Sequence, residues 1–232
     1  MIFDWLYPRR CPVCEDIVMP KGELVCDECR RKIPYIHSPR CCRCGKELAD
    51  DRQEFCYDCT RKTFYYECGA APLRYNAVMR RAMEGLKYRN KREYAEFFAA
   101  EILRAYGNML KSWQPDMLIP VPIHSARRRS RGYNQAELLA EPIGEWLGMP
   151  VRNDILIRSR STRPQNKLND KERRKNVEEA FQIKENGVQL KRVILVDDIY
   201  TTGSTVNACA KVLKEAGAGT VYFICACIGN GY

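Results

Sequence analysis

The second half of the chain alternates short apolar runs with longer amphipathic segments. The apolar runs predict four strands, at residues 117–121, 155–157, 192–196 and 221–226. The amphipathic segments predict four helices, at residues 78–87, 92–110, 134–147 and 205–216. Residues 193–196 read Val-Ile-Leu-Val, a continuous apolar run typical of a strand buried on both faces. This alternation favours a parallel α/β sheet with helices on both faces.

The first quarter of the chain lacks this periodicity and is rich in cysteine. Of the 13 cysteines, most precede residue 63, and Gly and Pro are not in excess. We therefore predict a small cysteine-rich domain over residues 1–62 and an α/β domain over residues 63–232. The α/β domain is expected to open with a short strand pair near residues 64–67 and 73–75.

The cysteine-rich region contains an internal repeat. RCPVC at 10–14 aligns with RCCRC at 40–44, and CDECRRK at 26–32 aligns with CYDCTRK at 56–62. Each unit reads C-x2-C-x11-C-x2-C, a spacing that brings four thiolates around one zinc ion. The predicted ligands are Cys11, Cys14, Cys26 and Cys29 in one unit and Cys41, Cys44, Cys56 and Cys59 in the other.

The favoured pairing of these knuckles is sequential, one zinc ion per unit, and a cross-braced pairing is the alternative. Four protein ligands leave no open position for substrate, which indicates structural zinc. Uncoordinated, buried cysteine would not explain a repeat of fixed spacing.

Composition limits the class of protein and the cellular location that we expect. Hydrophobic residues make up 45% and charged residues 29% of the chain, which excludes a disordered chain. No apolar run approaches the roughly 18 residues that span a bilayer, so we expect no membrane insertion. The first ten residues place their arginines after the apolar stretch, the wrong order for a secretory signal, and we expect a cytoplasmic protein. The formal charge of +10 makes a polyanionic partner plausible.

The most informative stretch is VILVDDIYTTGSTV at 193–206. Two acids, Asp197 and Asp198, follow the buried run, and a loop of small and hydroxyl residues precedes the helix. Free amides at a helix start favour a phosphate, whereas the carboxylates suit sugar hydroxyls or a hydrated magnesium ion. A Walker loop is excluded because its Gly-Lys pair is absent. The alternative is that Ser204 or Thr205 merely caps the helix.

This stretch resembles the binding motif for phosphoribosyl pyrophosphate (PRPP) in type I phosphoribosyltransferases. Nearly the whole chain resembles the ComF (ComFC) family, bacterial proteins associated with competence and DNA uptake. Besides the double zinc ribbon and the PRPP loop, the features that carry this resemblance are Tyr75, Leu86-Lys87-Tyr88, IPVPIHSARRRSRGYNQAELLA at 119–140, Arg160, Thr162, Gln165, Leu168, Arg173, Asn176 and Phe181.

The resemblance implies a type I phosphoribosyltransferase-like fold that binds PRPP with Mg²⁺. Asp197 and Asp198 would bind the ribose hydroxyls, and residues 123–127, with Ser125 and Arg127, would face the pyrophosphate. An arm near residues 158–176 would close over the site. The residues implied to hold the 5-phosphate are Thr201, Thr202, Gly203, Ser204 and Thr205.

Two segments are strongly basic: Arg127, Arg128, Arg129 and Arg131, and residues 158–175. They could form a solvated surface, neutralise pyrophosphate, or track the backbone of single-stranded DNA, with Tyr133 stacking on a base.

Three functions therefore compete. One is a phosphoribosyltransferase with an unidentified acceptor that acts in DNA uptake, together with other competence proteins. The second is a non-catalytic PRPP- or nucleotide-sensing module that binds DNA, and the third is nucleobase salvage.

Overall fold

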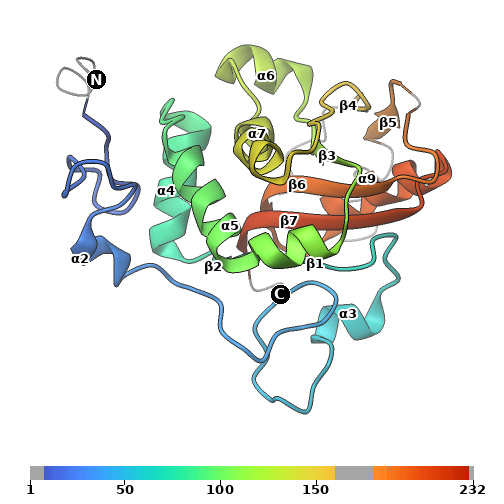
Figure 1. Cartoon of the computed structure of the whole chain (residues 1–232), viewed down its shortest axis with the longest axis horizontal. Helices are drawn as coiled ribbons and strands as arrows, with labels where there is room; N and C mark the ends of the chain where they lie inside the picture. Colours follow the sequence, from blue (N-terminus) through green and yellow to red (C-terminus); the bar gives the residue numbers. More distant parts are fainter. Residues whose placement is uncertain (1–7, 160–179, 186, 230–232) are drawn as a thin grey trace, which may run out of the picture.

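The computed structural model describes residues 8–159, 180–185 and 187–229. Its centre is a parallel sheet in the order β1-β7-β6-β3, with β2 also paired to β7 (Figure 1). Val193 lies beside Met117 on one side and Val221 on the other. The strands are β1 Gly69–Ala70, β2 Leu73–Arg74, β3 Met117–Pro120, β6 Arg192–Tyr200 and β7 Thr220–Ile228.

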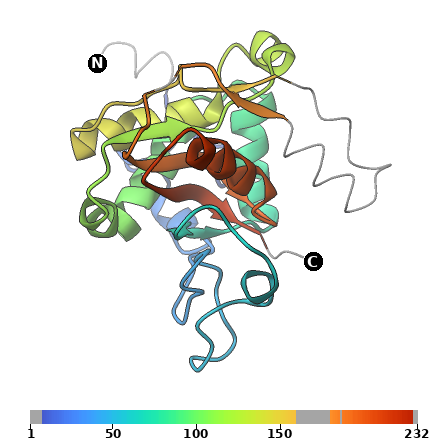
Figure 2. The same ribbon diagram turned by 90° about the vertical axis from the view of Figure 1, so that its right-hand side faces the viewer.

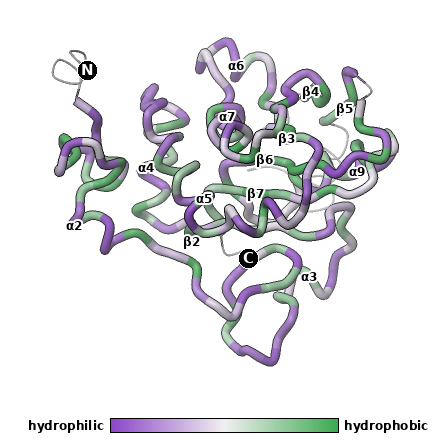
Figure 3. Tube along the Cα trace, in the orientation of Figure 1, coloured by the Kyte–Doolittle hydropathy of each residue, from purple (hydrophilic) through white to green (hydrophobic). Residues whose placement is uncertain are grey.

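Helices cover both faces of this sheet. Helices α4 (Ala77–Tyr88), α5 (Tyr94–Ser112) and α7 (Gln135–Leu147) lie on one face, and α9 (Ser204–Glu215) lies on the other, as Figure 2 shows. Alternate residues of β6 enter opposite cores: Ile194 packs with the α5 and α7 side chains, whereas Leu195 packs with those of α9. The central strands are accordingly among the most hydrophobic parts of the trace (Figure 3).

Several local predictions were wrong. Residues 64–67 form no strand; the short strands are β1 and β2, and both pair with β7 rather than with each other. Strand β6 continues to Tyr200, so the two acids lie within the strand. A separate antiparallel pair joins β4 (Leu156–Arg158) to β5 (Phe181–Ile183), a strand not predicted.

The two cysteine units pack on different parts of the α/β region (Figure 1). They contain the short helices α2 (Asp27–Arg30) and α3 (Tyr57–Arg61). We call the first unit ribbon 1 (residues 10–32) and the second ribbon 2 (residues 40–62). Each shares a hydrophobic cluster with the α/β elements, and the domain boundary after residue 62 stays a prediction.

Ribbon 1 lies against α4 and α5. The Tyr94 hydroxyl donates to the Cys11 carbonyl at 3.3 Å, and Arg89 forms an ion pair with Glu15 at 2.6 Å. Ribbon 2 lies against β1, where the Gly69 amide donates to the Arg43 carbonyl at 2.9 Å. In the part of the chain that the structure describes, no helix has the length and apolar character of a membrane span.

Candidate functional site

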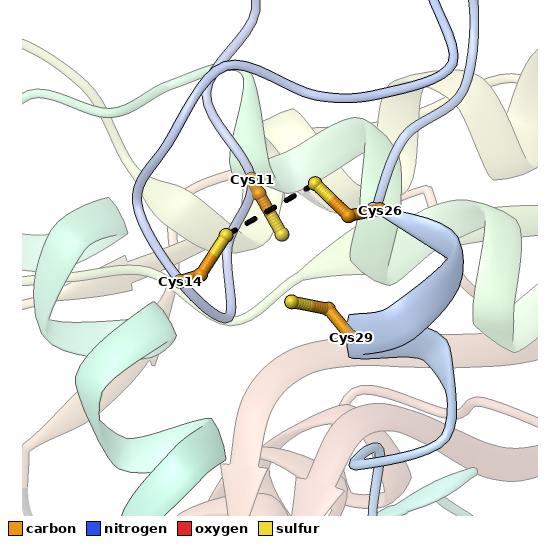
Figure 4. A group of neighbouring side chains, drawn as sticks. All are labelled: Cys11, Cys14, Cys26 and Cys29. Atoms are coloured by element: carbon orange, nitrogen blue, oxygen red, sulfur yellow. Dashed lines mark hydrogen bonds between the residues drawn. The ribbon is translucent and has the colours of Figure 1, made fainter.

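The eight repeat cysteines gather into two groups of four. One group is Cys11, Cys14, Cys26 and Cys29 (Figure 4), and the other is Cys41, Cys44, Cys56 and Cys59. Within each group the sulfur atoms lie within 4.8 Å of one another. This arrangement is the sequential pairing, one group in each ribbon.

The geometry of both groups fits zinc. A tetrahedron with Zn–S bonds of about 2.3 Å has sulfur–sulfur edges of about 3.8 Å. The Cys14 and Cys26 sulfurs are 4.0 Å apart, and those of Cys44 and Cys56 are 3.6 Å apart. Hydrogen bonds from Cys44, Cys56 and Cys59 lower the pKa of Cys41 far below its usual range, which favours a thiolate there. Each ribbon therefore forms one four-cysteine site with the ligand set of a structural zinc ion.

The acidic pair lies at the carboxyl end of β6. Asp197 and Asp198 are 8% and 5% exposed, and Oδ1 of Asp197 accepts a hydrogen bond from the Asp198 amide at 2.9 Å. Burial, and then the charge of Asp198, raise the pKa of Asp197 to about 7. Two adjacent, nearly buried carboxylates at a sheet edge are costly to fold, and such an arrangement is more common at functional sites than in structural cores.

A lysine from α4 completes this cluster. Lys87 Nζ lies 2.8 Å from Asp198 Oδ2, and this oxygen accepts no hydrogen bond of good angle among the described residues. Burial opposes the charged form of Lys87, but the Asp198 carboxylate outweighs it, so the pKa of Lys87 is raised. Lys87 was not predicted as a site residue. The feature of the sequence that could have indicated it is its position at the end of the amphipathic pattern of α4.

The loop after β6 turns tightly and leaves the start of α9 open. Gly203 has a φ of +77°, and no side chain caps the helix that begins at Ser204. The alternative that Ser204 or Thr205 caps the helix is therefore wrong. Thr202 and Ser204 hydroxyls lie 2.9 Å apart, and Thr201 and Thr202 are exposed. Uncapped first-turn amides beside exposed hydroxyls provide donors for an anion.

Buried tyrosines support this loop from below. The Tyr200 hydroxyl lies 2.7 Å from the Tyr66 hydroxyl, and the Tyr200 ring stacks on Phe223 with centroids 4.8 Å apart. Tyr66 follows ribbon 2 in the chain and packs in one cluster with Cys44 and Cys59. Ribbon 2 thus lies directly behind the loop.

The other side of the site is the segment that follows β3. Residues 125–131 form a short helix, α6 (Ser125–Arg131), which the sequence pattern did not predict. Ser125 and Arg127 lie in its first turn and are exposed. Asn134 fixes the following turn, because its side chain donates to the Val121 carbonyl at 3.0 Å and accepts from the Ala136 amide at 3.1 Å.

A pocket of about 540 Å³ separates the end of α4 from α6. It is lined by three cations, Lys87, Arg127 and Arg131, together with Tyr88, Asn90, Ala126, Ser130 and Tyr133. Burial, and then the charge of Arg127, lower the pKa of Arg158, which places a fourth cation nearby. The pocket therefore suits an anionic ligand, and Lys87 connects it to the acidic pair.

Tyr133 does not stack on a base as predicted: it is 6% exposed, and its hydroxyl donates to the Leu86 carbonyl. Tyr88 is the exposed aromatic residue here, at 75% exposure. Of the basic segment 158–175 and the arm 158–176, only Arg158 and Ser159 are described, and the remaining residues named for them lie outside the described residues.

Comparisons with known proteins identify the family. A model described as a double zinc ribbon domain matches residues 2–60, and one described as a phosphoribosyl transferase domain matches residues 98–231. Competence protein F of Haemophilus influenzae is 31% identical over 213 residues, which are 90% of this chain and 92% of that protein. The chain belongs to the competence protein F family.

Other relatives of this ComF-family chain are similar over most of their length. DNA utilization protein YhgH of Salmonella typhimurium is 31% identical, covering 95% of this chain and 97% of its own. Competence protein ComFC of Bacillus subtilis is 29% identical, covering 86% and 82%. A solved purine phosphoribosyltransferase from Pyrococcus horikoshii aligns with 56% of this chain and 72% of its own, at 18% identity and a TM-score of 0.36. The family models and the sheet topology carry the fold assignment, and the predicted fold class is confirmed.

Proposed function

We propose that this ComF-family protein binds Mg²⁺-PRPP and transfers its phosphoribosyl group to a nitrogen nucleophile in the handling of DNA during uptake. The observation that carries the proposal is the acidic pair Asp197-Asp198, which is joined by a tight glycine loop to the uncapped start of α9. The carboxylates can accept hydrogen bonds from sugar hydroxyls, and the free amides can bind a phosphate. These two groups lie close together in the chain and match the two ends of ribose 5-phosphate.

Each part of the site then has a role. Residues 201–205 hold the 5-phosphate through backbone amides and hydroxyls, and Asp197 and Asp198 accept hydrogen bonds from the ribose hydroxyls. Ser125 and Arg127, in the first turn of α6, face the pyrophosphate, and Arg127 also lines the pocket. Among the described residues, the groups able to hold a metal by themselves are the two four-cysteine sets. Mg²⁺ would therefore bring most of its oxygen ligands from PRPP and water, as it does in many phosphate sites.

The transfer breaks the bond between ribose C1 and the pyrophosphate oxygen, and pyrophosphate leaves with the electron pair. The acceptor nitrogen supplies the pair for the new C1–N bond and releases its proton to solvent. Positive charge develops on the ribose ring as the first bond breaks, so nearby carboxylates stabilise the transition state. Arg127 and Arg131, which line the pocket, stabilise the departing pyrophosphate by the same principle.

Binding is tested by the thermal stability of the protein with Mg²⁺-PRPP. A ligand that binds the native state raises Tm, by an amount that grows with its concentration. The double variant Asp197→Asn with Asp198→Asn should lose this shift. Asp116→Asn with Asp154→Asn makes the same change of charge away from the site and should keep it. A double Asn variant that binds PRPP as tightly as the wild type would show that these acids do not bind ribose.

Turnover distinguishes the enzyme from a sensing module. A transferase releases pyrophosphate from PRPP when an acceptor is present, whereas a sensor binds PRPP and releases none. The assay is pyrophosphate release with single-stranded DNA, with free nucleobases and with neither. Release with bases alone would favour nucleobase salvage, and PRPP binding without release under any condition would favour the sensor.

A second proposed activity is the binding of single-stranded DNA. The names of the H. influenzae and S. typhimurium relatives refer to competence and to DNA utilization. All four arginines of the 127–131 run lie on α6, and Arg128 is paired with Glu137 while Arg131 donates to Gln135. Arg127 and Arg129 are exposed and make no ion pair with another described residue, so they are the two best placed to contact a phosphate backbone.

The DNA proposal predicts a steep dependence on salt. Each backbone contact to a single strand contributes about −0.7 to the log–log slope of affinity against salt. Arg127→Ala with Arg129→Ala should therefore flatten the slope by about 1.4 and weaken all sequences alike. Lys191→Ala with Arg192→Ala, at the opposite edge of the sheet, is the charge-matched control. If the Arg127 and Arg129 changes abolish PRPP binding and spare DNA binding, these arginines serve the pyrophosphate instead.

A further inference from the structure

Lys87 lies where the acidic pair meets the cationic pocket. Its ammonium is 2.8 Å from Asp198 Oδ2, and the same side chain lines the pocket between α4 and α6. The Lys87 side chain is 18% exposed and that of Asp198 is 7% exposed, so solvent screens this ion pair only weakly. Lys87 and Asp198 come from α4 and β6, which are far apart in the sequence, so their contact depends on the tertiary fold.

We propose that Lys87 is a positioning residue of the sugar site, which holds the Asp198 carboxylate in place to accept hydrogen bonds from the ribose hydroxyls of PRPP. This inference rests on the proposed function. A carboxylate accepts hydrogen bonds from hydroxyl groups. Asp197 and Asp198 are adjacent and nearly buried, so a cation beside them offsets the repulsion between the two carboxylates. Lys87 contacts the Asp198 carboxylate directly and so fixes its orientation.

The charges around the ammonium agree with this role. Asp197 is the second carboxylate whose charge acts on Lys87, and the Tyr75 hydroxyl also interacts with it electrostatically. Arg158, in β4, is a second cation that acts on Asp197, after Lys87. Lys87 is the cation in direct contact with Asp198.

The end of α4 does not need the Lys87 ammonium for its own stability. The Tyr133 hydroxyl donates to the Leu86 carbonyl, and Arg89, just after the helix, pairs with Glu15 of ribbon 1. The Arg89 amide also closes the last turn on Gly85. Removing the charge of Lys87 should thus change the acidic pair more than the helix that carries it.

The test compares two ligands on two variants. We would measure the affinities of Mg²⁺-PRPP and of ribose 5-phosphate, which lacks the pyrophosphate, by calorimetry on wild type, Lys87→Met and Lys87→Arg. If Lys87 acts through Asp198, Lys87→Met should weaken both ligands by the same factor, at least about tenfold for a lost charge-assisted contact. Lys87→Arg should restore much of the affinity. Lys111→Met, on the surface of α5, is the control and should match the wild type.

The outcomes separate the possible failures. Equal affinities for wild type and Lys87→Met would overturn the proposed role, and so would a loss confined to PRPP, because Lys87 would then act on the pyrophosphate. Wild-type protein that binds neither ligand would overturn the proposed function and this role with it. Circular dichroism and Tm establish whether Lys87→Met is folded, and failure of the folded Lys87→Arg variant to restore both ligands also counts against the proposal.

Discussion

Replacement of Gly203 by alanine should destabilise the phosphate loop (residues 201–205), and the structure allows the loss of stability to be estimated. The residue has a φ of +77°, and a Cβ atom built on it would overlap the Tyr200 hydroxyl oxygen and lie 2.8 Å from the ring carbon that bears it. Contacts this short require the tyrosine or the loop to move. Tyr200 is buried and stacked on Phe223, so the loop has little space to accommodate the methyl group.

The expected cost has two parts. An alanine in the left-handed region costs about 1–2 kcal/mol. Displacing the Tyr200 hydroxyl from Tyr66 leaves a buried polar group unsatisfied, which adds about 1–3 kcal/mol. Gly148 separates the two parts, because it has a φ of +68° and no atom within 4 Å of the added Cβ. Gly148→Ala should therefore show only the first cost.

The assay is thermal unfolding of the two variants, with and without Mg²⁺-PRPP. For a chain of this size each kcal/mol corresponds to roughly 2–4 °C in Tm, so Gly203→Ala should melt at least about 2 °C below Gly148→Ala. Gly148→Ala should keep the shift caused by PRPP, whereas Gly203→Ala should lose most of it. Equal melting temperatures and equal PRPP shifts in the two variants would refute the reasoning.

Two further predictions concern metal and pH. Purified protein should contain two zinc ions per chain by elemental analysis; Cys44→Ser should reduce this to about one, whereas Cys42→Ser, a change outside both sets, should leave two. Zinc content unaffected by Cys44→Ser would contradict the assignment of ribbon 2. Because the pKa of Asp197 is raised to about 7, the native state binds a proton that the unfolded chain releases near pH 4. This contribution to stability is present at acidic pH and is lost as the pH rises through about 7, and Asp197→Asn should flatten that part of the profile in urea unfolding. An unchanged profile would place the titration elsewhere.

The sequence was sufficient for features that depend on local pattern. The apolar run at 193–196 and the amphipathic helices follow from periodicity, and the cysteine repeat favours the sequential grouping that the structure shows. Helix α6 was missed because it has no buried residue and hence no apolar face to detect. Strands β1 and β2 have two residues each, too few for an alternating pattern.

Contacts between segments that lie far apart in the sequence could not be predicted from local pattern. Tyr133 beside an arginine run reads as a surface residue, and only the packing of α4 against the following turn explains its burial. Lys87 has no local feature that indicates Asp198 as its partner. Both residues line the candidate site, whose walls come from several elements. Hydrophobic periodicity predicts each element separately and does not predict how the elements pack together.

The bond between Tyr66 and Tyr200 has a thermodynamic consequence for the ribbon behind the loop. One hydroxyl follows ribbon 2 and the other ends β6, so the loop and the ribbon share a buried contact. If a bound phosphate orders the loop and, through this contact, the ribbon, thermodynamic linkage makes the effect reciprocal. Ordering of the ribbon must then strengthen phosphate binding by the same free energy. Amide hydrogen exchange at Gly45 and Gly69, where ribbon 2 meets β1, should then slow when PRPP binds. The ribbon would thus report whether the phosphate loop is occupied.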